Sequence, residues 1–147
     1  MGYKDDAGKV ILDTELAAML RKGTIREVRH SNDSVISGYF ARPKKAAGKY
    51  RPIVSLKYTN RFIRKVKFRM TTTSQIRDWI KPGHYFVSLD LEDAYFSIPI
   101  HQDYWRYTRF VWKGRTFEYK VVMFGLGPSA RVFTKVLRAV VVFLRTE

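Results

Sequence analysis

The sequence predicts an α+β fold in which β-hairpins and helices pack on one antiparallel sheet. Two pairs of strand-like segments, rich in aromatic and β-branched residues, are each joined by a connection that contains glycine, as hairpins are. Segments with apolar residues at helical spacing lie before, between and after these pairs. The chain has 147 residues, of which 46% are hydrophobic, so we expect one hydrophobic core and a single domain over residues 1–147.

The first third of the chain predicts a short amphipathic helix followed by a hairpin. Asp13 is placed to cap the helix, which continues through an apolar stripe over residues 15–20 and ends at Gly23. Strands are expected over Ser37–Arg42 and Arg51–Leu56, because both segments are rich in aromatic or branched residues. The loop between them is basic and contains a glycine, so the hairpin should carry positive charge at its tip.

The middle of the chain predicts a second helix and a strand that ends in an acidic residue. Thr72–Ser74 offer N-caps for the helix, which runs through Ile80 and is ended by Pro82-Gly83. His84–Leu91 is a nearly continuous apolar run of strand length, which is typical of a central strand buried on both faces. This strand would deliver Asp90 at its carboxyl end.

The last third predicts a second hairpin and a long helix. Strands over Tyr107–Trp112 and Thr116–Val121 flank a tight turn, in which Gly114 suits a positive φ angle. Pro128 stands where the first turn of a helix tolerates proline, and apolar residues at helical spacing continue to Leu144. We expect this helix to pack on the sheet.

The composition excludes several classes of site. Cysteine is absent, so disulfides, thiolate zinc sites and cysteine nucleophiles are excluded, and a reducing intracellular compartment is favoured, whether nucleus or cytoplasm. The longest apolar run, Ala139–Leu144, is far shorter than the ~20 residues that span a bilayer, so we expect no membrane partner. The three histidines lie far apart in the sequence and predict no zinc site.

The charge of the chain is strongly and unevenly positive. The net charge is +15, from 28 Lys and Arg against 13 Asp and Glu, and no acidic residue lies between Asp33 and Asp78. A polyanion is the natural partner of such a surface, although a solvated basic face, a ribosome-type protein or a membrane-surface protein would share it. If the partner is nucleic acid, the residues expected to contact it are Lys49, Lys57, Arg61, Arg64, Lys65 and Lys67.

Asp90 is the residue with the clearest chemical meaning. A carboxylate at the end of a buried strand costs desolvation energy unless a cation balances it. Mg²⁺ held by one or two carboxylates and by substrate phosphates is one such arrangement. The alternative is that Asp90 caps the turn at Glu92-Asp93-Ala94, and the residues by themselves leave the two interpretations open.

A family resemblance favours the metal-binding interpretation. Residues 86–100, FVSLDLEDAYFSIPI, resemble motif A of the reverse transcriptases of retroviruses and LTR-type retrotransposons, especially the DIRS and Ty3-like groups. The segments 49–54, 104–121 and 124–126 continue the resemblance in order, over roughly residues 10 to 145. It implies a right-hand polymerase fold with fingers over about 10–83 and a partial palm over about 84–147. The implied activity is RNA-directed DNA polymerisation by two-metal nucleotidyl transfer.

The resemblance also implies roles for individual residues. Asp90 would be the first catalytic and metal-binding carboxylate, with the Leu91 carbonyl beside it, for Mg²⁺ or Mn²⁺. Tyr95 would lie against the sugar of the incoming dNTP and exclude a 2′-hydroxyl, unless it is a core aromatic. Asn60 matches an asparagine of the fingers with a structural role. The implied nucleotide contacts are Asp93, Ala94, Tyr95, Arg51, Lys44 or Lys45, Phe124 and Gly125, and the implied partners are dNTP and an RNA or DNA template-primer.

The sequence departs from the family pattern in two places. In the loop before the last helix, Met123 and Ala130 replace two usual prolines, and Pro128 is new, which should alter the start of that helix. The aromatic-x-Asp-Asp motif C, the thumb and the RNase H domain would all begin beyond Glu147. We therefore expect metal binding to be weak or absent and catalysis incomplete in this chain. The N-terminal Tyr3-Lys4-Asp5-Asp6 spells motif C at the wrong end, without apolar strands on both sides.

Three functions follow as alternatives. The first is a fragment of a retroelement reverse transcriptase that is inactive alone, and the second is a non-catalytic nucleic-acid-binding module derived from such an enzyme. The third is a protein-interaction subunit that reuses the fold. In each case the exposed apolar face of the last helix predicts self-association.

Overall fold

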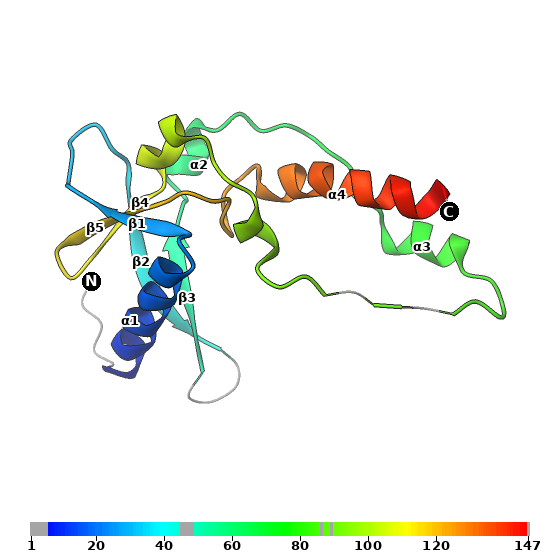
Figure 1. The fold of residues 1–147 in the computed structure, drawn as a ribbon, viewed down its shortest axis with the longest axis horizontal. Helices are drawn as coiled ribbons and strands as arrows, with labels where there is room; N and C mark the ends of the chain where they lie inside the picture. The colour runs from blue at the N-terminus through cyan, green and yellow to red at the C-terminus, as the bar shows by residue number, and fades with distance from the viewer. Residues whose placement is uncertain (1–5, 45–48, 86, 89, 147) are drawn as a thin grey trace.

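The computed structural model describes residues 6–44, 49–85, 87–88 and 90–146, and Figure 1 shows their arrangement. The elements in order are α1 (Asp6–Arg21), β1 (Ile25–Val28), β2 (Ile36–Pro43), β3 (Tyr50–Ser55), α2 (Thr59–Phe62), α3 (Thr73–Trp79), η1 (Ala94–Ser97), η2 (Gln102–Tyr107), β4 (Arg109–Trp112), β5 (Arg115–Tyr119) and α4 (Ser129–Thr146). Two of the helical elements, η1 and η2, are 3₁₀ helices.

The strands form one five-stranded sheet in the order β1-β5-β4-β2-β3. Both predicted hairpins are present, with β2 antiparallel to β3 and β4 antiparallel to β5. In the second turn Lys113 and Gly114 have φ angles of 49° and 75°, as a tight hairpin requires. The expectation of a purely antiparallel sheet is wrong at one place, because β2 and β4 pair in parallel, with Ile36 opposite Arg109.

Strand β1 has no counterpart in the sequence prediction. Its residues, Ile-Arg-Glu-Val, place two adjacent charged side chains between two apolar ones, so they lack the alternation that indicates a strand. The strand forms because β5 offers a free edge, to which it pairs antiparallel with Ile25 opposite Tyr119. Pairing to a distant segment, rather than local pattern, therefore decides this element.

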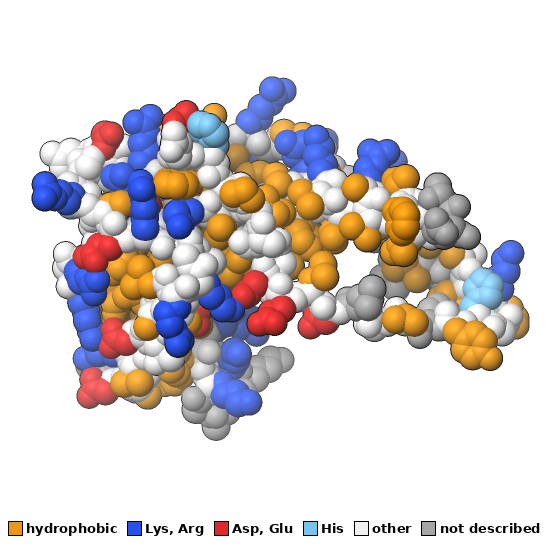
Figure 2. Space-filling model, viewed as in Figure 1, with side chains coloured by type: hydrophobic (Ala, Val, Ile, Leu, Met, Phe, Trp, Pro, Cys, Tyr) orange, Lys and Arg blue, Asp and Glu red, His pale blue; other side chains and the backbone are white. Residues whose placement is uncertain are grey.

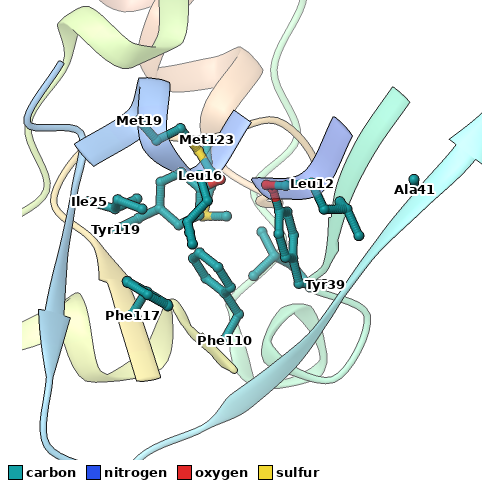
Figure 3. Close-up of a cluster of buried hydrophobic side chains, with 11 residues drawn as sticks. Leu12, Leu16, Met19, Ile25, Tyr39, Ala41, Phe110, Phe117, Tyr119 and Met123 are labelled. Atoms are coloured by element: carbon teal, nitrogen blue, oxygen red, sulfur yellow. Dashed lines mark hydrogen bonds between the residues drawn. The ribbon is translucent and has the colours of Figure 1, made fainter. Parts of the chain in front are cut away.

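The hydrophobic core lies between α1 and the sheet (Figure 3). Leu12, Leu16 and Met19 are buried on one face of α1, at the spacing of successive helical turns. The rings of Phe110 and Phe117 stack with their centroids 5.6 Å apart, and both are fully buried. The remaining members of the cluster are Ile25, Tyr39, Ala41, Leu56, Tyr119 and Met123.

Helix α1 begins earlier than predicted, so Asp13 is not its cap. The helix starts at Asp6, and Asp13 lies in its middle, where its carboxylate accepts hydrogen bonds from Trp112 Nε1 and Lys113 Nζ, both at 2.7 Å. The bond from Lys113 and then that from Trp112 lower the pKa of Asp13. Residues before Asp13 extend the helix because Gly8 and Leu12 are buried on the same face as Leu16. The predicted end is confirmed, with Gly23 at φ 67°.

The predicted central strand over residues 84–91 is not formed in the described part of that segment. Tyr85 is 99% exposed and Val87 is 86% exposed. Figure 1 shows the described residues of this segment apart from the sheet, between α3 and η1. A central strand needs a hydrogen-bonded neighbour and a covering layer on each face. No strand among the described residues supplies either one to this segment, and Leu91 at its end is also exposed.

The second predicted helix is confirmed as α3. Thr72 is its N-cap, and its side chain forms a capping box with Gln75. Ile76, Trp79 and Ile80 are nevertheless about half exposed, so the apolar stripe of this helix is not covered by the described residues.

The last helix, α4, does not pack on the sheet as predicted. It contacts η1 through the ring of Phe133, which lies 5.3 Å from that of Tyr95, and Figure 1 shows the helix extending away from the strands. A row of its apolar side chains is 41 to 62% exposed: Val136, Val140, Val141, Val142, Phe143 and Leu144. Among the described residues, no helix is both long and apolar enough to span a membrane.

Candidate functional site

A cavity of about 290 Å³ lies between α1, the β2–β3 hairpin, η1 and the turn that follows β5. Arg51 of β3, Asp93 before η1 and Phe124 after β5 all line it. Glu15 of α1 and Phe96 of η1 line it too. The fold therefore brings together three of the residues that were expected to contact a nucleotide, from three distant segments of the chain.

Asp93 occupies an unusual backbone conformation at this cavity. Its φ and ψ angles are 52° and 32°, in the left-handed region that few residues other than glycine adopt. Its carbonyl accepts a hydrogen bond from the Ser97 amide at 3.2 Å, which closes η1. Its side chain does not cap η1 but forms an ion pair with Lys22, at the end of α1, and the hydrogen bond in this pair raises the pKa of Lys22. Sequence reasoning did not identify Lys22, because nothing local connects it to Asp93.

Tyr95 and Phe96 are adjacent, and both rings contact Phe124, but each ring also has a neighbour of its own. The ring of Tyr95 lies 4.7 Å from that of Phe124 and stands perpendicular to that of Phe133, 5.3 Å away. The ring of Phe96 lies 6.3 Å from that of Tyr119 and packs against the core. Phe96 lines the cavity, whereas Tyr95 does not and is half-buried between Phe124 and α4.

The loop that carries Phe124 and Gly125 is tied to α2 by a single side chain. Asn60 donates from Nδ2 to the Gly125 carbonyl at 2.7 Å and accepts at Oδ1 from the Gly127 amide at 2.8 Å. A β-carbon at Gly127 would lie 3.3 Å from Asn60 Oδ1, so the close approach favours glycine there. Gly125 has φ 85°, and Phe124 is 66% exposed at the loop tip. This double contact explains the structural role expected for Asn60.

The expected triphosphate-binding cations lie along the first hairpin. Arg51 is exposed and lines the cavity. The Lys44 amide donates to the Lys49 carbonyl at 2.7 Å, which places both residues at the loop end of the hairpin, and neither lines the cavity. Lys45 lies outside the described residues.

Asp90 and Leu91 lie outside the cavity, and both are exposed. Among the described residues, no group of three or more His, Cys, Asp or Glu side chains is placed to hold a metal ion. The structure therefore brings three of the expected nucleotide contacts to one cavity, whereas the two expected metal ligands, Asp90 and Leu91, lie outside it. The two remaining members of the turn, Ala94 and Tyr95, follow Asp93 into η1.

A second candidate surface is a basic groove between the segment 63–71 and α4. Two cavities of about 370 and 640 Å³ lie along it, and they share Phe68 and Arg131. No acidic residue lines either cavity within the described part of the chain. Figure 2 shows Lys and Arg side chains next to hydrophobic ones along this edge of the molecule. The cations that line the groove are Arg64, Lys65, Lys67, Arg69, Arg131, Lys135 and Arg138.

This groove includes some of the expected nucleic-acid contacts and adds others. Arg64, Lys65 and Lys67 were predicted and line it, whereas Lys49, Lys57 and Arg61 do not. The cations of α4 were missed, because its helical pattern was interpreted only through its apolar stripe. Their spacing could have indicated a basic face, since Arg131, Lys135 and Arg138 recur at intervals of four and three residues.

Known proteins resemble this chain in sequence and in structure. The sequence profile described as reverse transcriptase (RNA-dependent DNA polymerase) matches residues 42–147. The Gag-Pol polyprotein of Walleye dermal sarcoma virus is 29% identical over 98 residues, which are 65% of this chain and 6% of the polyprotein.

Among solved structures, the foamy viral protease-reverse transcriptase in complex with dsDNA matches with a TM-score of 0.74 and 17% identity, over 93% of this chain and 28% of that one. The native prototype foamy virus protease-reverse transcriptase matches with a TM-score of 0.76 and 19% identity, over 93% of this chain and 18% of that one. The mixed α+β fold with its five-stranded sheet is thus the fold of these enzymes' fingers and palm. The chain spans less than a third of each relative, and its family profile covers more than half of its own length. The chain belongs to the reverse transcriptase family.

Proposed function

We propose that these residues are the fingers, about 10–83, and part of the palm, about 84–147, of an intracellular retroelement reverse transcriptase. The element would be of the LTR type and DIRS- or Ty3-like, as the motif A resemblance implies. The reaction would add dNTP to a primer along a nucleic-acid template by two-metal nucleotidyl transfer. The observation that carries this proposal is the convergence of Arg51, Asp93 and Phe124 on one cavity, with Tyr95 packed on Phe124.

Each of these residues has a defined part in binding the nucleotide. The Arg51 guanidinium is exposed and positively charged, so it would hold phosphate oxygens through paired hydrogen bonds. Lys44 at the hairpin loop, or Lys45, which lies outside the described residues, would contact the same phosphates. The turn from Asp93 to Tyr95 would place backbone amides and the Tyr95 ring beside the triphosphate and the sugar. Phe124 and Gly125 would border the base.

A divalent ion, Mg²⁺ or Mn²⁺, would supply charge neutralisation for the phosphates when it is bound. The oxygen donors of Asp90 and of the Leu91 carbonyl suit such an ion. The described residues do not complete its coordination, because no group of three candidate side chains is present among them. From this chain we therefore assign only Asp90 and the Leu91 carbonyl as ligands.

The groove beside α4 would bind the template strand. Its lining combines seven cations and no acids with apolar side chains such as Phe68 and Met70, which suits a strand that presents both phosphates and bases. A foamy viral relative has been solved in complex with dsDNA, which supports nucleic acid as the partner of this fold.

Oligonucleotide binding tests the groove. We expect affinity for a single-stranded oligonucleotide to fall steeply with salt, and the log-log slope to decrease by ~0.7 to 0.9 for each phosphate-binding cation that is removed. The double variant Arg131→Ala/Lys135→Ala removes two groove cations, and Lys9→Ala/Arg29→Ala removes the same charge elsewhere. Fluorescence anisotropy across a salt series separates them. An equal decrease in affinity for both variants would mean that net charge alone binds the oligonucleotide.

The second candidate function is a nucleic-acid-binding module without catalysis. The arrangement of carboxylates supports it, since Asp90 is exposed and the described residues include no group of three or more His, Cys, Asp or Glu placed to hold a metal ion. Primer extension with Mg²⁺ or Mn²⁺ distinguishes the two, and we expect none from these 147 residues alone. Template-dependent incorporation that Asp90→Asn abolishes would contradict this and establish a complete catalytic site.

A further inference from the structure

The ion pair between Lys22 and Asp93 joins the end of one helix to the start of another, 71 residues further along the chain. Lys22 follows directly on the last residue of α1, and Asp93 directly precedes η1. Both side chains are partly exposed, at 50% and 39%, so their charges are accessible to salt. The pair therefore lies at the rim of the candidate cavity rather than in the core.

The Lys22 side of this pair is fixed by the core. The Lys22 amide donates to the Ala18 carbonyl at 2.9 Å, and the Thr24 amide donates to the Met19 carbonyl at 3.1 Å. Met19 itself is 3% exposed. The backbone around Lys22 is thus held in place by hydrogen bonds to α1 and by the burial of Met19, so Lys22 can hold its partner in a defined position.

On the Asp93 side of the pair, among the described residues nearby, only those that follow Asp93 in the chain are held by hydrogen bonds to the rest of the fold. After η1, the Val122 amide donates to the Ile98 carbonyl at 2.8 Å, and Pro99 pairs with Val121. Before Asp93, the described residues from Tyr85 to Leu91 are exposed and belong to no strand. Asp93 is therefore the junction between a held segment and an unpaired one.

The left-handed backbone at Asp93 needs such a tether. A residue other than glycine is strained in this region unless its surroundings favour the conformation. Asp93 makes no side-chain cap hydrogen bond to η1, and its carboxylate accepts a hydrogen bond from Lys22 instead.

We propose that Lys22 is a positioning residue, which holds the Asp93–Tyr95 turn at the cavity and so sets where Tyr95 and the preceding Asp90 lie. This inference rests on the proposed function, because the turn matters only if the cavity binds a nucleotide. Removal of the Lys22 charge releases the turn while the core of α1 stays packed.

Hydrogen exchange of backbone amides, measured by NMR, tests the tether without any ligand. In Lys22→Met we expect the Ser97 amide, which closes η1, to exchange at least ~5-fold faster, with an unchanged unfolding midpoint. Lys22→Arg keeps the charge and should restore protection. Lys9→Met is the matched control, since Lys9 lies on the same helix, is 44% exposed and pairs with Asp6. Unchanged Ser97 exchange in Lys22→Met, or equal acceleration in Lys9→Met, overturns the inference.

Titration with a fluorescent dNTP and Mg²⁺ provides the second measurement. We expect Lys22→Met to weaken nucleotide binding by ~3- to 10-fold and Lys22→Arg to bind as the unmodified chain does. If the unmodified chain binds no nucleotide, the proposed function fails, while the exchange data still decide the tether. If Lys22→Met and Lys22→Arg weaken binding equally, the charge of Lys22 does not hold the turn and the inference is wrong.

Discussion

At the scale of single residues, Tyr95 is the side chain whose position bears most directly on the choice of substrate. Its ring packs between Phe124, which lines the candidate cavity, and Phe133 of α4, and it is half-buried. Under the proposed function, the ring would lie against the 2′ edge of a bound sugar and leave no room for a hydroxyl. The packing on Phe133 shows that the same ring also supports α4.

We predict that Tyr95→Val raises the binding of rNTP relative to dNTP by ~10-fold, which corresponds to ~1.4 kcal/mol. Tyr95→Phe keeps the ring and should change neither the preference nor the stability. Competition titrations with the two nucleotides, beside urea unfolding, measure both properties. If Tyr95→Val only lowers the free energy of unfolding and leaves the nucleotide preference unchanged, Tyr95 is a packing residue and not a selector.

Asp13 makes the free energy of unfolding of the chain depend on pH in the acidic range. Hydrogen bonds from Lys113 and Trp112 hold its pKa below the usual value of 3.8, so the unfolded chain takes up a proton at higher pH than the folded one. The stabilisation is therefore present above about pH 3.8 and is lost as the pH falls through the lower folded value. We expect Asp13→Asn to be less stable than the unmodified chain at about pH 7, and the difference between them to shrink as the pH is lowered below 3.8. A difference in urea unfolding that stays constant over this pH range would contradict this.

At the scale of elements, a buried ionic cluster joins three strands. Glu118 of β5 is 1% exposed and lies opposite both Arg26 of β1 and Arg109 of β4 in the sheet register. Its carboxylate contacts Arg26 at 2.8 Å and Arg109 at 2.7 Å, and the Arg26 guanidinium stacks 4.6 Å above the ring of Trp105 in η2. The cluster therefore fixes β1 and η2 to the central hairpin.

We predict that Glu118→Ala lowers the free energy of unfolding by ~3 to 5 kcal/mol, because the carboxylate between two guanidinium groups is removed. Glu27→Ala is the matched control, since Glu27 of β1 pairs with Arg115 of β5 but is 46% exposed. This variant should lower the free energy of unfolding by less than ~1 kcal/mol. Urea unfolding measures both variants. If the two variants lower the free energy of unfolding by similar amounts, the burial of Glu118 does not increase its contribution to stability.

At the scale of the whole molecule, the exposed apolar side chains of α4 are the feature from which we predict self-association. Val136 and Val140 are each 52% exposed and lie one turn apart on this helix, with further exposed apolar side chains beyond them. An apolar face of this kind favours association in water. We expect a second copy to cover it, so the unfolding midpoint should rise with protein concentration.

We predict that Val136→Lys/Val140→Lys shifts the chain toward monomer in sedimentation velocity. The single control Val10→Lys places a charge on α1 at a position that is 62% exposed and should leave the distribution unchanged. A monodisperse monomer in the unmodified chain at all concentrations would contradict self-association through α4.

The sequence by itself determined the elements whose signals are local. The two hairpins, the turn at Lys113-Gly114 and the capping box at Thr72 were all predictable, because turn chemistry and alternation act over a few residues. The same holds for the motif around Asp93 and Tyr95, whose order along the chain indicated the reverse transcriptase family that the profile match confirms. Residue roles within that motif stay predictions.

Only the tertiary structure decided the features that depend on distant neighbours. Strand β1 forms because β5 offers it an edge, and Tyr85 and Val87 are exposed because no described strand lies beside them. The contacts of Lys22 with Asp93 and of Asn60 with the Gly125–Gly127 loop join segments far apart in sequence. Such contacts leave no local pattern, because the energy of pairing and packing depends on which segments the fold brings together rather than on the residues next in the chain.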